Sequence, residues 1–291
     1  MNKFTIKDIE NLSGIKAHTW RIWEQRYGIG IPQRKDSNHR YYDNENLKQV
    51  LRISYLYHSG LKVSKIASLG HEQIRQKALE HLPKENEYEF YVKELLEASI
   101  DLDEDRFERL LQEAMMKMSV TETMINVLYT FQEKIGVLWL TDHVIPAQEH
   151  FTSNIIRRKL TVAIDELPMV NYTLKKTVLL FTPRHEQHEL PLQLIHYLLK
   201  KNNTKVVYFG KDVSLKELDV YLQSQPADIL LFHLLTLLKT TATAYLEELS
   251  RLFPGKEIIM TGPLTKQITN IPSNIRFLAS MDEVINFCSA S

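Results

Sequence analysis

The sequence predicts a multidomain chain of α and α/β class: a small helical head with a β-hairpin, a four-helix bundle, and a doubly wound, parallel five-stranded sheet. Helical runs separated by turn signals fill the first eighty residues, and helical spacing alone continues over 88–170. After residue 175, short β-rich runs alternate with helical stretches. A length of 291 residues suits two or three domains. We predict domains over 1–75, 88–170 and 175–291.

Composition and charge narrow the class of protein. With 44% hydrophobic and 25% charged residues, the chain is globular, and its single Cys288 excludes a disulfide framework or a cysteine-rich zinc site. The amino terminus lacks a signal-peptide core, and the interrupted apolar run 229–238 is too short to span a membrane. We therefore expect a soluble, cytoplasmic protein without a membrane partner.

The neutral net charge hides an asymmetry between the head and the rest of the chain. Residues 1–75 hold 13 Lys and Arg against 7 Asp and Glu, whereas the other residues hold 23 against 29. A head of +6 on a body of −6 indicates a nucleic-acid-binding module on a different kind of body.

Two short helices joined by a tight turn open the head. Thr5 can cap a helix whose apolar residues recur to Leu12, Ser13-Gly14 breaks the pattern, and a second helix follows over 16–27. This is a helix-turn-helix outline, in which the second helix enters the major groove of DNA.

A basic, aromatic segment follows the second helix. Residues 32–42 contain the turn Asp36-Ser37-Asn38 and predict a β-hairpin wing that meets phosphates or a minor groove. Asp43 is expected to cap a helix that Gly60 ends, and Ser64 to cap another over about 65–79. The head thus predicts a winged helix-turn-helix domain.

The expected DNA contacts come from the second helix and the wing. They are Lys16, His18, Thr19, Arg21, Trp23, Gln25, Arg26, Tyr27, Arg34, Lys35, His39, Arg40 and Tyr42. Trp20, Tyr41 and Leu47 are assigned to the core, and Glu24 is expected to orient arginine side chains.

These motifs resemble the DNA-binding domain of the MerR family of bacterial transcription regulators. The resemblance rests on Phe4-Thr5-Ile6, on Thr19-Trp20-Arg21-Ile22-Trp23-Glu24-Gln25-Arg26-Tyr27-Gly28, on Pro32 and Arg34, on His39-Arg40-Tyr41-Tyr42, and on Gly60 and Ile66. The second helix is most similar to the subgroup that carries a cobalamin-binding sensor. The resemblance implies promoter DNA as a partner and a homo-oligomer, either a dimer or a tetramer.

The middle of the chain predicts four helices, near 88–99, 104–118, 120–134 and 138–165. Their expected boundaries lie at Asp101 or Asp103, at Ser119 or Thr121, and at Gly136. Glu149-His150 lacks the second His of a zinc-protease helix, so we reject that class. Trp139, Glu149 and His150 resemble the helical cap of cobalamin-binding regulators, which implies that they line the upper, adenosyl face of the corrin. The alternative is a buried Trp with a core His.

The last third predicts strands at 177–182, 205–209, 227–233, 257–261 and 275–279, with helices near 190–202, 214–225, 240–253, 264–269 and 281–289. Ligands of such sheets bind at the carboxyl ends of the strands. Without a glycine-rich phosphate motif, a dinucleotide or nucleotide site is unsupported.

The loop after the first of these strands resembles the acid-x-His motif of cobalamin-binding domains. The resemblance implies that His188 is the lower cobalt ligand, the one metal-binding residue, and that Glu186 orients it. Three positions depart from the family: Pro191 replaces a Gly, His233 a Ser, and Thr261-Gly262 a Gly-Gly pair that admits the cofactor's nucleotide tail. His233, Thr261 and Gly262 would line that tail, in an altered binding mode or in a domain that has lost the cofactor.

The whole sequence therefore predicts a DNA-binding transcription regulator, not an enzyme, whose cofactor is adenosylcobalamin or another cobalamin. One alternative is a regulator whose sheet domain is a degenerate, cofactor-free module for oligomerisation or interaction. A second is a corrinoid carrier or methyltransferase subunit, which the helical cap and the sheet would suit but the basic head would not.

Overall fold

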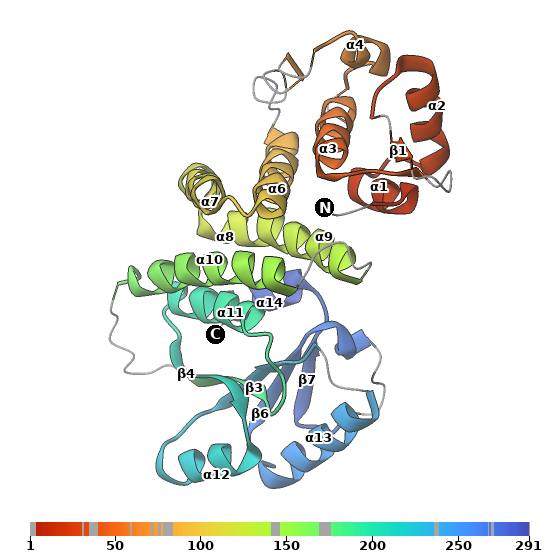
Figure 1. The fold of residues 1–291 in the computed structure, drawn as a ribbon. Coiled ribbons are helices and arrows are strands. Elements are labelled where there is room, and N and C mark those ends of the chain that lie inside the picture. Colours follow the sequence, from red (N-terminus) through yellow and green to blue (C-terminus); the bar gives the residue numbers. More distant parts are fainter. Residues whose placement is uncertain are drawn as a thin grey trace. The chain divides into compact units, whose positions relative to one another are not determined.

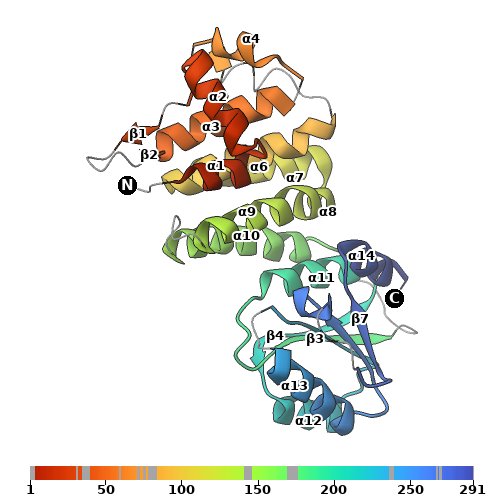
Figure 2. The same ribbon diagram turned by 90° about the vertical axis from the view of Figure 1, so that its right-hand side faces the viewer.

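The computed structural model describes residues 4–30, 32–34, 40–58, 60–70, 73–74, 77, 84–140, 146–168, 176–235, 239–266, 268 and 271–290. The chain divides into two compact units, Met1–Ile155 and Ile156–Ser291. Figures 1 and 2 show the elements of each unit. The three domain boundaries of the sequence analysis remain a prediction.

The head consists of short helices and a two-stranded hairpin. Its elements are α1 (Ile6–Ser13), α2 (Ala17–Tyr27), β1 (Gln33–Arg34), β2 (Arg40–Tyr41), α3 (Asn44–His58) and α4 (Val63–Ala67). Thr5 forms a capping box with Asp8, as expected of an N-cap, and Gly14 ends α1 in the left-handed conformation. Ser64, in contrast, is not a cap: α4 begins one residue earlier, after Lys62, without a side-chain cap.

The helical part of the first unit packs next to α3. It comprises α6 (Lys84–Asp101), α7 (Glu104–Met118), α8 (Val120–Glu122), the π-helical turn η1 (Thr123–Leu128), α9 (Tyr129–Leu140) and the start of α10 (Pro146–Asp165). Asp103 and Ser119 cap their helices as predicted. Gly136 does not end a helix, because α9 continues through it to Leu140.

A five-stranded parallel sheet forms the second unit. The strands β3 (Thr177–Pro183), β4 (Lys205–Val213), β5 (Ile229–His233), β6 (Glu257–Thr261) and β7 (Ile275–Leu278) lie in the order β4-β3-β5-β6-β7. The connecting helices are α11 (Leu190–Lys201), α12 (Leu215–Ser224), α13 (Lys239–Leu252), η2 (Pro263–Lys266) and α14 (Met281–Ala290). This order places the topological switch point between β3 and β5.

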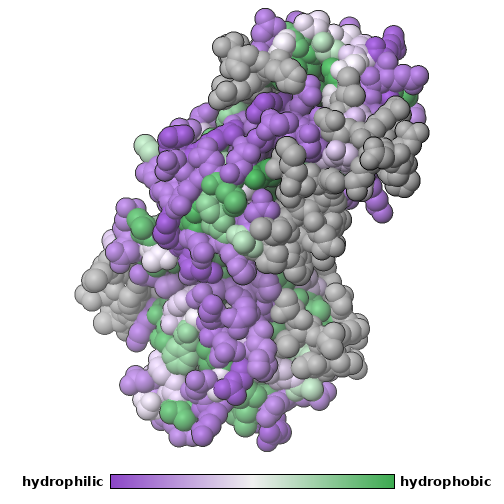
Figure 3. Space-filling view, in the orientation of Figure 1, coloured by the Kyte–Doolittle hydropathy of each residue, from purple (hydrophilic) through white to green (hydrophobic). Residues whose placement is uncertain are grey.

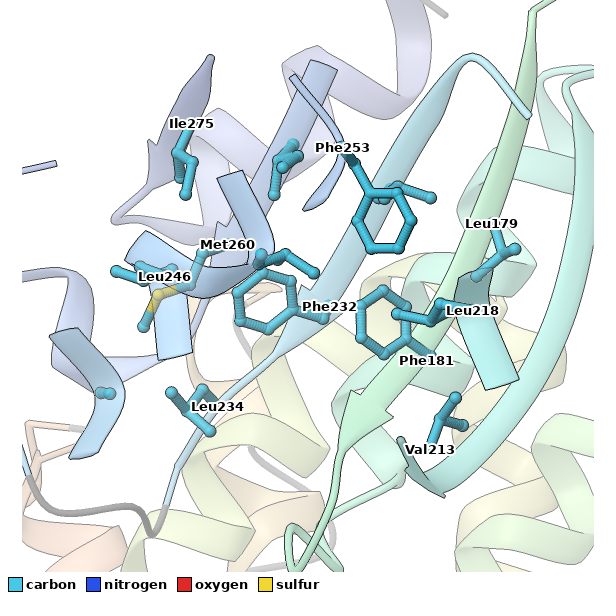
Figure 4. Packing of buried hydrophobic residues seen from close by; sticks show 14 of the residues in the cluster. Leu179, Phe181, Val213, Leu218, Phe232, Leu234, Leu246, Phe253, Met260 and Ile275 are labelled. Atoms are coloured by element: carbon cyan, nitrogen blue, oxygen red, sulfur yellow. The ribbon is translucent and has the colours of Figure 1, made fainter. Parts of the chain in front are cut away.

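Helices cover both faces of the sheet, with α11 and α14 on one face and α12 and α13 on the other (Figure 2). Figure 4 shows the second face, where Phe181 and Phe232 lie side by side with ring centroids 5.5 Å apart. Leu218 of α12 and Leu246 of α13 complete this core. Burial on both faces explains the continuous apolar runs of β3 and β5.

The surface is mixed in character. On the face shown in Figure 3, hydrophilic residues cover most of the coloured surface, and hydrophobic residues form separate groups among them. Single large apolar side chains such as Met116 and Val220 are exposed, which is ordinary for a globular protein. A search of the described helices finds none with the length and apolarity of a membrane span.

Candidate functional site

One face of α2 presents polar side chains to solvent. His18, Arg21 and Gln25 are exposed at helical spacing, and Arg26 is exposed beside them. The opposite face holds Trp20, which is fully buried. A buried apolar anchor on one face and a row of exposed polar side chains on the other is the arrangement that a major-groove helix requires.

The start of α2 is held by α1. The N-cap Lys16 supplies no side-chain cap, and Glu10 Oε2 instead accepts a hydrogen bond of 3.1 Å from the N–H of Ala17. The ammonium of Lys16 lies 2.9 Å from Glu10 Oε1, and this interaction lowers the pKa of Glu10. Lys16 is highly exposed and can exchange this partner for a phosphate.

Two predicted DNA contacts are wrong, because their side chains are buried. Trp23 is 6% exposed and packs edge-on against Tyr57, with ring centroids 4.7 Å apart. Tyr42 is 1% exposed, and its hydroxyl donates to the carboxylate of Glu24, the residue expected to orient arginines. The half-buried Tyr41 had been assigned to the core. An error of one residue in strand register exchanges the two faces in this way.

The other predicted contacts lie on α2 and the hairpin. Thr19 and Tyr27 are half-buried, and the guanidinium of Arg26 lies 5.4 Å from the ring centre of Tyr27. Arg34 pairs with Arg40 across the antiparallel hairpin; only their backbones are described. Lys35 and His39 lie outside the described residues. Backbone hydrogen bonds of 2.8 and 2.9 Å between Phe4 and Tyr42 attach the hairpin to the start of the chain.

The three predicted residues of the upper corrin face lie in the first unit. Trp139 is in α9, where the backbone alone is described. The Glu149 carboxylate accepts from the hydroxyl of Ser153, one turn further along α10, and lies 3.7 Å from Nε2 of the exposed His150. Their role toward a cofactor remains a prediction.

The acid-His pair of the second unit is assembled at the switch point. The Glu186 side chain is completely buried, and its Oε1 lies 2.6 Å from Nδ1 of His188. Its Oε2 accepts a hydrogen bond of 2.7 Å from the N–H of Leu235, in the loop after β5. The carboxylate therefore orients the ring of His188 through its Nδ1.

The loop that carries His188 is also held from β4. The hydroxyl of Thr182 donates a hydrogen bond of 2.7 Å to the carbonyl of Glu186 and accepts one of 3.1 Å from the N–H of Asp212. The Asp212 carboxylate accepts 2.7 Å from the N–H of His185, whose backbone is left-handed. These hydrogen bonds hold the loop that carries the imidazole of His188.

Sequence reasoning missed a polar cluster behind this loop. The hydroxyl of Tyr208 donates 2.8 Å to Glu189 Oε1, and Arg157 lies 4.0 Å from Glu189 Oε2. The ring of His196 stacks on Tyr208 at 4.8 Å, and burial lowers the pKa of His196 to about 4. In the sequence, this cluster is marked only by a tyrosine in an edge strand. Its partners Glu189, Arg157 and His196 come from three separate elements, so their proximity cannot be read from the sequence.

The ends of β5 and β6 close tightly beside Glu186. His233 is 8% exposed, and its Nδ1 lies 2.9 Å from the Thr261 hydroxyl. Burial lowers the pKa of His233 to about 4, so its ring is neutral at pH 7. Gly262 has a φ of +114°, and a Cβ there would lie 2.2 Å from the carbonyl oxygen of Leu234. The residues present fit a corrinoid at the axial ligand, whereas those around His233 leave little room for its tail.

Comparisons with known proteins agree with this arrangement. Residues 4–71 match the MerR HTH family of regulatory proteins, and residues 91–164 match the B12 binding domain family. The HTH-type transcriptional repressor CarA of Myxococcus xanthus is 30% identical over 210 residues, or 71% of this chain and 68% of that protein. The repressor CarH of the same organism is 23% identical over 227 residues, covering 74% and 73%.

A solved structure has a similar fold. The monomethylamine corrinoid protein of Methanosarcina barkeri aligns with a TM-score of 0.55 at 15% identity, over 67% of this chain and 95% of that protein. This likeness concerns the fold alone. The head and B12 binding domain, together with the two repressors, show that this chain belongs to the family of MerR-type transcription regulators that carry a B12-binding domain.

Proposed function

We propose that this chain is a non-enzymatic, cytoplasmic regulator that binds promoter duplex DNA as a homo-oligomer and represses transcription. The observation that carries the proposal is the exposed row of His18, Arg21 and Gln25 on a helix anchored by a buried tryptophan. The related proteins are named repressors, which supports the negative sign of regulation.

Its signal would be a corrinoid, which His188 would hold through its imidazole, oriented by Glu186. An adenosylated upper face against Trp139, Glu149 and His150 follows from the family resemblance. The alternative of a cofactor-free interaction module is favoured by the tight ends of β5 and β6. The match of residues 4–71 to the MerR HTH family argues against a corrinoid carrier.

The DNA face is tested with a duplex selected by the wild-type protein from a random library. Arg21→Ala should weaken binding by about tenfold or more, as expected for loss of a base or phosphate contact. Arg109→Ala removes the same charge from an exposed position on α7 and should leave affinity unchanged. Wild-type affinity should fall steeply with salt, because phosphate contacts release counterions. Equal affinities for the two variants would refute this DNA face.

The cofactor is tested by dark incubation with adenosylcobalamin, desalting, and measurement of the visible spectrum. Retained absorbance that changes in His188→Ala supports ligation by this residue. His185→Asn is the matched control: this exposed histidine in the same loop has a left-handed backbone, which Asn accepts. A wild-type protein that retains no corrinoid would leave the DNA-binding proposal standing and remove the cofactor.

A further inference from the structure

We propose that the site selects corrinoids that lack the nucleotide arm, and this inference rests on the proposed corrinoid binding. In a complete cobalamin, the arm and its benzimidazole base project from the lower side of the ring. If a protein histidine replaced the base, the displaced arm would lie next to that histidine. For His188 this means the carboxyl edge of the sheet. The fit of the arm depends on the neighbouring strand ends.

The strand ends on the β5 side are joined to one another. Leu234 N–H donates 3.0 Å to the carbonyl of Thr261, while the Thr261 hydroxyl contacts both His233 Nδ1 at 2.9 Å and the Phe232 carbonyl at 3.3 Å. The hydroxyl can donate to the carbonyl and accept from the imidazole N–H, so both buried groups have partners. Separating these strands would leave a buried imidazole and hydroxyl without them, which is costly.

Among the described residues, the turn that follows β6 is closely packed at Gly262. The carbonyl oxygen of Leu234 lies 2.2 Å from the point where a Cβ of Gly262 would be, and Cε1 of His233 lies 3.3 Å from the same point. The imidazole of His233 thus occupies the space between the ends of β5 and β6. Its side chain is bulky and shielded from solvent, and a nucleotide cannot enter without displacing it.

The β4 side of His188 is held by hydrogen bonds as well. Thr182 and Asp212 connect the ends of β3 and β4 through a 3.1 Å hydrogen bond, and the loop N–H of His185 is bound to Asp212. The Glu186–His188 pair itself remains well formed between these two closed flanks. A corrin ring with an axial position for His188 needs only that pair, whereas a nucleotide arm needs one of the flanks to open.

The test compares hydroxocobalamin with hydroxocobinamide, which lacks the nucleotide arm, by calorimetric titration of the full chain and visible spectra after desalting. We expect the wild type to bind the cobinamide more tightly. Cobalamin is also disfavoured because its own base must be displaced. The deciding quantity is therefore the dissociation constant of cobalamin divided by that of cobinamide, compared between the wild type and His233→Ser/Thr261→Gly. In the double variant this ratio should fall by about tenfold, while the affinity for cobinamide and its dependence on His188 stay unchanged.

The matched control is His196→Ser, which removes another histidine with a depressed pKa from the same unit but from α11. It should leave the ratio as in the wild type. If the double variant fails to fold, His233→Ser alone carries the test. An unchanged ratio in a folded variant, or equal binding of both corrinoids by the wild type, overturns the inference alone. Failure of the wild type to bind either corrinoid overturns the proposed cofactor instead.

Discussion

At the scale of single residues, burial determines the chemistry of the sheet unit. His196 and His233 both have a pKa of about 4, in each case chiefly because burial disfavours the charged imidazole. Burial also raises the pKa of Cys288 to about 12, so this thiol is unreactive at neutral pH. His188 differs from these residues in being exposed, and the buried carboxylate of Glu186 orients its ring.

The depressed pKa of His196 predicts a pH-dependent stability. Between about pH 6.5 and pH 4 the unfolded chain binds a proton that the folded state rejects, so the free energy of unfolding decreases as pH falls through this window. His196→Phe keeps a ring against Tyr208 and removes the titration. The loss of unfolding free energy between pH 7 and pH 4.5 should then be smaller by about 2 kcal/mol. Urea unfolding at the two pH values measures it.

His185→Asn, at an exposed histidine in the same unit, serves as the control for the effect of substituting a histidine as such. If His196→Phe kept the wild-type pH dependence, the proton uptake that weakens the unit in acid would have to belong to other groups. Both variants are compared at equal ionic strength, because screening changes with added salt.

At the scale of elements, the sequence predicts best where local signals act alone. Thr5, Asp103 and Ser119 cap helices as expected, since an N-cap depends on a few neighbouring residues. The alternation of strands and helices after residue 175 likewise predicts the observed parallel sheet. The acid-His pair could be located only through its resemblance to a family motif, whereas the contact between His233 and Thr261 depends on register between strands.

Other features could not be predicted, because they depend on tertiary packing. Gly136 has the residue type of a helix end, yet α9 passes through it. The π-helical turn Thr123–Leu128 has no distinct periodicity in the sequence. Trp23 and Tyr42 lie in a segment rich in DNA-contacting residue types, and only the packing of Tyr57 and Glu24 assigns them to the interior.

A buried ion pair joins the head to the helices of its unit. The guanidinium of Arg52 in α3 contacts both oxygens of Glu97 in α6, at 3.0 and 2.6 Å, and Arg106 of α7 lies 3.1 Å from the same carboxylate. The Glu97 side chain is completely buried. Its removal leaves the largely buried Arg52 without its counter-charge, while Arg106 keeps Glu94 at 2.6 Å, so Glu97→Ala should lower the free energy of unfolding by about 3–5 kcal/mol in urea titrations.

Asp101→Ala provides the comparison within the same interface. Asp101 lies 2.7 Å from Lys48, but 35% of its side chain is exposed, and a solvated pair contributes at most about 1 kcal/mol. A loss below about 1 kcal/mol for Glu97→Ala as well would mean that water or a neighbouring acid, such as Glu94, compensates Arg52 and Arg106.

At the scale of the whole molecule, two modules of different charge and architecture share one chain. The basic head belongs to the first compact unit, and the parallel sheet belongs to the second. The second unit has a hydrophobic core of its own: the cluster around Phe181 and Phe232 draws all its members from residues 179–277. A core that is complete within one unit supports cooperative unfolding of that unit by itself.

Thermal unfolding of the full chain should therefore show two transitions in differential scanning calorimetry. Glu97→Ala should lower only the transition of the first unit. Phe232→Ala should lower only that of the second, since deleting a fully buried phenyl ring costs about 3–5 kcal/mol. If either variant moved both transitions together, or if one transition fitted the wild type, the units would unfold as one body. In that case, a ligand bound in the sheet unit could affect the head simply by stabilising the whole chain. If the units unfold independently, coupling between ligand binding and the head requires a specific contact or a change of oligomeric state.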